Sequence, residues 1–152
     1  MFGKKFQEYI QFQRWILILI AAVFLIRLGL SFAGMPISQA RWVSINLVLL
    51  VGLMYCSVAV HTRGFGSYKQ LFGLLLVQTA FAHLLIACGI ILGIVSGTDN
   101  IYTVPEVFGG SNGRNWPHVL AHVLGAIVLP IFGWLFGSAI LFLAKRLKKP
   151  AH

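Results

Sequence analysis

Three histidines lie within or at the edge of strongly apolar parts of the chain. Two of them, His118 and His122, belong to the stretch GGSNGRNWPHVLAH (109–122), where a polar, glycine-rich turn passes into a long apolar run. Residues four apart share one face of a helix, so both imidazoles should face the same neighbour. Such a pair can bind zinc or copper, but two nitrogens do not complete the site. The third ligand would have to come from Asp99, Glu106 or a partner chain.

A structural role for the pair is the alternative. No glutamate follows the first histidine as it does in the zinc-protease motif. Asn115 and Pro117 are the residue types that begin a helix, the first as a cap and the second in the first turn. His118 and His122 would then anchor the start of a helix at the membrane surface.

His83 lies near the middle of another apolar segment, in TAFAHLLIA. Polar residues within a membrane span are costly and are often functional. Thr79, Ala80 and Ala87 should lie on the same helical face and leave a recess beside the ring. The ring is therefore suited to be the axial ligand of a tetrapyrrole, either haem b or (bacterio)chlorophyll. A hydrogen bond to a hydroxyl or carbonyl group of the next helix is the alternative.

The depths of the histidines argue against one haem held by both His83 and His122. His83 lies 14 residues before Gly97, and His122 lies 5 residues after Pro117, the expected outer helix ends. At ~1.5 Å per residue, the two rings should differ in depth by roughly 13 Å. Separate tetrapyrroles, or a haem shared with a partner subunit, suit this spacing better.

Arg27, in FLIRLGLS, is the other costly residue. Its long side chain can extend to the membrane surface. Otherwise it should pair with an acid of the outer loop or with an anionic group of a cofactor or lipid. Arg27 therefore joins the three histidines as a candidate cofactor-binding residue.

Membrane-spanning helices must position these side chains. The chain has 152 residues, of which 59% are hydrophobic and only 10% are charged, and its mean hydropathy is +0.87. These values are typical of an integral membrane protein, in which the spans must be α-helices because every backbone group needs a partner. We predict one membrane domain (1–152), an all-α four-transmembrane-helix bundle. Its parts are an amphipathic N-terminal interfacial helix within 1–14, spans at about 15–32, 42–60, 71–95 and 117–144, an outer loop at 97–116 and a basic tail at 145–152.

The distribution of basic residues predicts the orientation. Nine lysines and arginines flank one side of the spans, whereas three belong to the other side. By the positive-inside rule, both termini should be cytoplasmic, in a bacterial inner membrane. The net charge of +9 does not indicate nucleic-acid binding, because the basic residues lie in tails and short loops, where they meet anionic lipid. The nine are Lys4, Lys5, Arg14, Arg63, Lys69, Lys145, Arg146, Lys148 and Lys149, and the three are Arg27, Arg41 and Arg114.

Rows of glycines predict close helix packing. Small residues at four-residue intervals let helix backbones approach each other in a membrane. The two rows should form a tight hairpin within one chain, or mediate self-association or contact with other membrane subunits. They consist of Gly89, Gly93 and Gly97 in the third span and Gly125, Gly133 and Gly137 in the fourth.

The sequence favours a non-catalytic accessory subunit of a larger membrane complex, of a redox or photosynthetic kind. No predicted span contains Asp or Glu, and no Ser/His/Asp or Cys/His nucleophile set is recognisable. A small b-type cytochrome or quinone-linked redox protein is the alternative. A small transporter or channel fits less well, because the two halves of the chain show little internal repetition.

Overall fold

The computed structural model describes residues 1–40, 42–104 and 112–147, and in these ranges the regular secondary structure is helical. Four of the helices are long and apolar enough to cross a membrane, as the sequence predicts. Arg41, Glu106, Lys148, Lys149 and His152 lie outside the described residues. The helices are α1 (Phe6–Phe12), α2 (Arg14–Phe32), α3 (Ile37–Ala40), α4 (Ile45–Thr62), α5 (Tyr68–Ser96) and α6 (Trp116–Leu147).

Local capping explains where the helices depart from the predicted spans. The second span was expected from residue 42, but α4 begins at Ile45, because the hydroxyl oxygen of Ser44 accepts the N–H of Leu47 at 3.4 Å. Helix α5 begins three residues earlier than expected, since Ser67 and Gln70 form a capping box. Helix α6 continues to Leu147, and basic residues in its last turn suit the negative end of the helix dipole.

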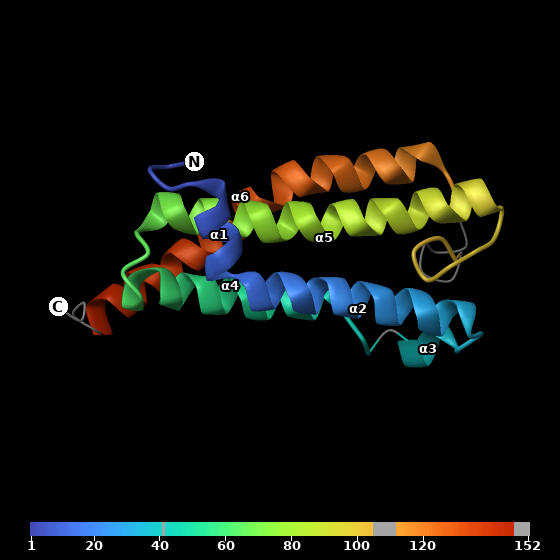
Figure 1. Cartoon of the computed structure of the whole chain (residues 1–152), viewed down its shortest axis with the longest axis horizontal. Coiled ribbons are helices and arrows are strands. Elements are labelled where there is room, and N and C mark those ends of the chain that lie inside the picture. Colours follow the sequence, from blue (N-terminus) through green and yellow to red (C-terminus); the bar gives the residue numbers. More distant parts are fainter. Residues whose placement is uncertain (41, 105–111, 148–152) are drawn as a thin grey trace.

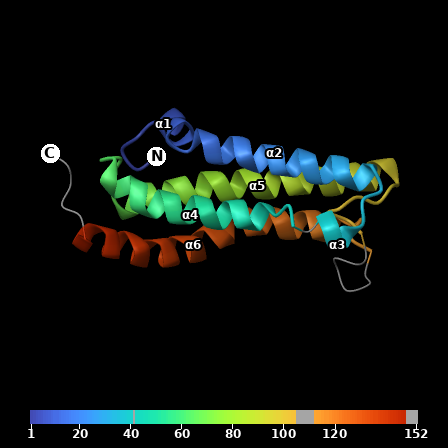
Figure 2. The same cartoon turned by 90° about the horizontal axis from the view of Figure 1, so that it is seen from below.

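Helix α5 is the central element, and it packs against α2, α4 and α6. Figures 1 and 2 show the long helices side by side, with α1 at the end where the chain begins. We call this the terminal end and the opposite end, where α5 meets the 97–115 connection, the loop end. One buried apolar cluster lies near each end, around Ile90 at the loop end and around Leu71 at the terminal end.

Helix α6 packs against both α5 and α4. It reaches both because it changes direction near its middle (Figure 1). Pro130 lies in this part of the sequence, and a proline inside a helix removes a backbone hydrogen bond and bends the axis. Before the bend, Gly125 faces His83 of α5. After the bend, Gly137 faces Ser57 of α4.

The N-terminal helix packs more deeply than its amphipathic pattern predicts. Tyr9 is fully buried, although Phe6 is 60% exposed on the same short helix. The Tyr9 hydroxyl donates to the carbonyl oxygen of Met1 at 3.0 Å, and the Gln13 amide donates to the carbonyl oxygen of Leu74 in α5 at 3.1 Å. The Gln13 bond, together with the packing of the Tyr9 ring against Gly73, holds α1 at the terminal end of α5. Its position at the membrane surface stays a prediction.

The two glycine rows do not face each other within this chain, and self-association or contact with other subunits through them stays a prediction. A Cβ atom on Gly89 would lie 2.6 Å from the ring of Tyr102, and one on Gly93 would lie 2.9 Å from Thr103. Gly97 ends α5 in a left-handed conformation, with φ of +70°. The glycine row on α5 therefore packs against the connection that follows this helix. Residues 100–103 of the connection fold back between α2 and α5.

Candidate functional site

His83 and His122 are in direct contact. Their Nδ1 atoms are 3.0 Å apart, and their ring centroids are 5.1 Å apart at an interplanar angle of 42°. The predicted difference in depth between these rings is therefore wrong. Both histidines lie at one level between α5 and α6, although 39 residues separate them in the sequence.

The error came from placing the outer ends of α5 and α6 at one depth. Helix α5 continues for 13 residues beyond His83, to Ser96, whereas α6 begins 6 residues before His122, at Trp116. At ~1.5 Å per residue, the end of α5 projects about 10 Å farther than the start of α6. The connection covers this difference, since residues such as Asn100 return along α5.

His118 extends this contact toward the loop end. Its ring centroid lies 5.1 Å from that of His122, as expected for two residues on one helical face. Its Nδ1 donates to the carbonyl oxygen of Gly113 at 2.9 Å, and its backbone N–H is capped by Asn115 at 2.8 Å. The predicted helix start at Asn115 is confirmed. We refer to His83, His118 and His122 as the histidine row.

Gly125 gives His83 its place against α6. A Cβ atom at this position would lie 3.0 Å from Cε1 and 3.1 Å from Nδ1 of the His83 ring. The absence of a side chain therefore lets the ring approach the helix closely enough to reach His122. The sequence pattern predicted that Gly125 packs closely, but it did not identify His83 as the side chain that Gly125 contacts.

A pocket of about 240 Å³ lies between α4, α5 and α6, at the end of the histidine row formed by His83. Its polar lining consists of Asn46, Gln78, Thr79 and His83, and the rest of the lining is leucine and glycine. Gln78 is only 2% exposed, and its amide nitrogen lies 3.4 Å from the carbonyl oxygen of Leu49. Its Oε1 is buried and has no hydrogen-bond partner among the described residues.

Sequence reasoning missed Asn46 and Gln78. The signal was present, because both are polar residues within predicted apolar spans, and such residues carry a cost in lipid. What the sequence could not supply is the register that places Asn46 of α4 opposite His83 of α5.

Asp99, one of the expected third metal ligands, does not join the histidines. Asp99 pairs with Arg114, with the carboxylate oxygen 3.0 Å from Nε, and Glu106 is not described. Among the described residues, no group of three His, Cys, Asp or Glu side chains is arranged to hold a metal ion. Metal binding by His118 and His122 stays a prediction.

The facing Nδ1 atoms of His83 and His122 are too close together to ligate one haem iron from opposite sides. Two nitrogens on opposite sides of one metal ion are separated by about 4 Å, twice a metal–nitrogen bond of ~2.0–2.1 Å. The observed separation of the Nδ1 atoms is 3.0 Å. The adjacent pocket is also smaller than the ~300–1,000 Å³ of typical sites for drug-sized ligands. Binding of a tetrapyrrole by His83, His118 or His122 alone stays a prediction.

Among the described residues, Arg27 contacts the aromatic ring of Tyr102. Its guanidinium carbon lies 5.5 Å from the ring centroid of Tyr102, and its Nε is buried with no hydrogen-bond partner among the described residues. Tyr102 also stacks on Phe24 at 5.3 Å and donates to the Phe24 carbonyl oxygen at 3.4 Å. Burial raises the pKa of Tyr102 to about 12, and the charge of Arg27 opposes part of this rise.

Comparison with protein-family models finds no match, and comparisons with curated proteins and with solved structures find none.

Proposed function

We propose that this chain is a membrane subunit that transfers protons between its loop end and a small pocket in the middle of the bilayer. The observation that carries the proposal is the 3.0 Å contact between the Nδ1 atoms of His83 and His122, which joins the histidine row to the pocket. Histidine chains are among the groups that conduct protons within membranes.

The hydrogen-bond chemistry of the row supports ring-to-ring transfer. Only one of two facing Nδ1 atoms can donate, so in the neutral pair His83 and His122 are different tautomers. His118 must be protonated on Nδ1, because the carbonyl oxygen of Gly113 accepts from it. When His83 donates to His122, the proton of His122 is on Nε2, and the next neutral ring, His118, has an unprotonated Nε2. A proton taken up from the pocket on Nε2 of His83 would let the Nδ1 proton pass to His122, and the Nε2 proton of His122 would then pass to Nε2 of His118. The Nδ1 proton of His118 would leave for water at the loop end after the ring turns away from the Gly113 carbonyl oxygen, which cannot itself take up a proton.

The pocket is suited to the head group of a lipid-soluble carrier such as a quinone. Its polar residues provide amide, hydroxyl and imidazole groups that can bond the oxygen atoms of a quinone ring. Its leucine side chains would provide apolar contacts for the start of the isoprenoid tail. Quinone chemistry also needs an electron carrier, which we assign to a metal or haem centre of a partner subunit.

The wider proposal is therefore an accessory subunit of a larger redox complex, in a bacterial inner membrane with both termini in the cytoplasm. The excess of basic residues at the terminal end supports this orientation. Purification in native lipid followed by mass spectrometry of co-purifying chains tests the subunit part. Isolation as a homo-oligomer without partner chains would contradict it.

Difference infrared spectroscopy tests the proton path directly. The protein would be reconstituted in lipid with a short-chain quinone, which is then reduced electrochemically. We expect imidazole bands to change on reduction in the wild type, and to be lost in His83→Gln. His61→Gln is the matched control, since His61 lies in the last turn of α4, at the terminal end, and its spectrum should match the wild type. Unchanged imidazole bands in the wild type would refute the proposal.

An absorption spectrum of the purified protein separates this proposal from the tetrapyrrole expectation. If the proposed proton path is correct, the purified protein should transfer protons to the quinone and should show no Soret band from this chain. A stoichiometric Soret band that disappears in His83→Gln would instead establish a haem or chlorophyll ligand and overturn the proposal.

A further inference from the structure

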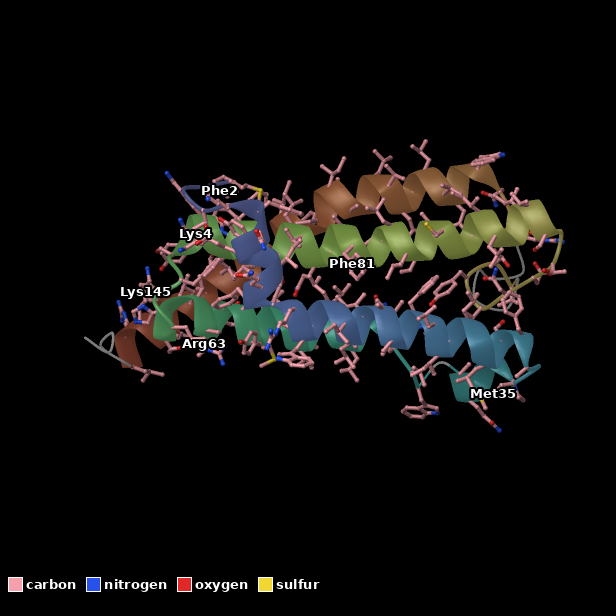
Figure 3. The ribbon with its side chains drawn as sticks, in the orientation of Figure 1. Phe2, Lys4, Met35, Arg63, Phe81 and Lys145 are labelled. Carbon is pink, nitrogen blue, oxygen red and sulfur yellow. The ribbon has the colours of Figure 1, made fainter. Side chains whose placement is uncertain are left out.

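A second pocket, of about 540 Å³, lies at the terminal end of the molecule. It shares no lining residue with the pocket beside the histidine row. It is formed where the α1–α2 junction meets α4, and it is lined by residues 11–16 together with Val51, Tyr55 and Arg63. Figure 3 shows the Arg63 side chain near this end of the molecule. No part of this pocket is used in the proposed proton path.

Two guanidinium groups from different helices line the pocket. Arg14 is the first residue of α2, and Arg63 follows the last residue of α4. Each lies over an aromatic ring that lines the same pocket, Arg14 at 5.0 Å from Trp15 and Arg63 at 5.3 Å from Tyr55. These rings restrict the guanidinium groups, whose planar donor sets are suited to bind phosphate oxygens.

The local charge is strongly positive. No acidic residue lines the pocket. Among the described residues, Glu8 is the acid of the terminal end, and its carboxylate is already bonded to Lys4 at 3.2 Å and to the backbone N–H of Lys5 at 2.6 Å. The guanidinium groups of Arg14 and Arg63 therefore lack a carboxylate counter-ion from the pocket lining, and an external anion would stabilise them.

Apart from Gln11 and Gln13, the remaining lining is aromatic or aliphatic and lies at the edge of the predicted membrane. Phe12, Ile16 and Val51 contribute aliphatic and aromatic surface beside the two arginines. Trp15 is 69% exposed at the start of a span, where tryptophan is enriched at the lipid interface. A free phosphate ion would meet the arginines only, whereas a phospholipid would meet both the arginines and the apolar walls.

We propose that this pocket binds an anionic phospholipid, with its phosphate on Arg14 and Arg63 and its acyl chains along the apolar wall. The bound lipid would hold the α1–α2 junction against α4. This inference is independent of the proposed proton transfer, because it involves other residues at the opposite end of α4.

Native mass spectrometry of the full chain with added phosphatidylglycerol, phosphatidylcholine or inorganic phosphate tests this site. We expect selective retention of phosphatidylglycerol. An interfacial basic residue contributes about 1 kcal/mol of attraction to anionic lipid, so Arg14→Gln or Arg63→Gln should weaken binding about five-fold and the double variant about thirty-fold. Arg146→Gln is the control, because it removes the same charge at the same end but its guanidinium lies over Phe142, outside the pocket.

Three outcomes would overturn the proposal. They are equal retention of the two lipids, equal weakening by Arg146→Gln, and phosphate binding as tight as lipid binding. A second measurement needs no charge variant. Phosphatidylglycerol with brominated acyl chains should quench the fluorescence of Trp15, identified by subtracting the spectrum of Trp15→Phe, at a lower mole fraction than brominated phosphatidylcholine. Equal quenching by both lipids would also refute the site.

Discussion

Replacing Gly125 by alanine should separate His83 from His122 with a single methyl group. The added Cβ would lie 3.0 Å from Cε1 and 3.1 Å from Nδ1 of His83. Carbon atoms normally meet at ~3.5–4.0 Å, so the ring must retreat by about 0.5 Å. Because Gly125 and His122 are on the same helix, this movement should lengthen the 3.0 Å Nδ1 contact toward the limit of a hydrogen bond.

The expected change in stability is close to zero for this variant. Loss of the hydrogen bond should cost about 0.5–1.5 kcal/mol, while replacing a helical glycine by alanine should stabilise by about 0.5–1 kcal/mol. Gly133→Ala provides the matched control, because its new Cβ would meet only Leu53 at 3.4 Å and Leu75 at 3.9 Å, which are ordinary contacts. That variant should gain the full helical stabilisation, so the two should differ by about 1 kcal/mol.

Two measurements check this prediction in the reconstituted protein. Steric-trapping titrations give the free energy of unfolding in lipid for the wild type and both variants. Nitrogen NMR of labelled histidine shows whether one Nδ1–H still bonds to a second imidazole. If Gly125→Ala is stabilised as much as Gly133→Ala and keeps the wild-type histidine spectrum, the assigned role of Gly125 is wrong.

The loop end yields three further predictions, each checked on the purified chain. Gly89→Ala should destabilise by about 1–3 kcal/mol in a thermal melt, because its Cβ would lie 2.6 Å from Tyr102, whereas Gly29→Ala, with nothing within 4 Å, should not destabilise. Asn100→Ala should cost about 2–4 kcal/mol by the same assay, since its amide bonds the Gly89 carbonyl at 2.8 Å and the Tyr102 N–H at 2.9 Å; an unchanged melting temperature would count against this role. The pKa of Tyr102 is raised from 10.0 to about 12. The contribution of the neutral Tyr102 side chain to the free energy of unfolding should therefore be complete below pH 10 and lost between pH 10 and 12. A Tyr102→Phe difference titration at 295 nm would show this, and a tyrosine that ionises near pH 10 would contradict it.

Local properties of the sequence were enough to predict the helices and the pair within one helix. Hydropathy over a span depends only on neighbouring residues, and the four long helices follow it to within a few positions. The shared face of His118 and His122 follows from helical periodicity alone. Asn115 as a cap is equally local, because it bonds a residue three positions away.

Tertiary structure decided which side chains meet across helices. His83 reaches His122 because α5 projects beyond the start of α6 and the connection folds back, and hydropathy does not encode this relative height. Arg27 lies over Tyr102 for the same reason, since the returning connection brings a residue 75 positions later against α2. Spacing along one helix is set by its own geometry, whereas the register between two helices depends on the packing of all the side chains between them.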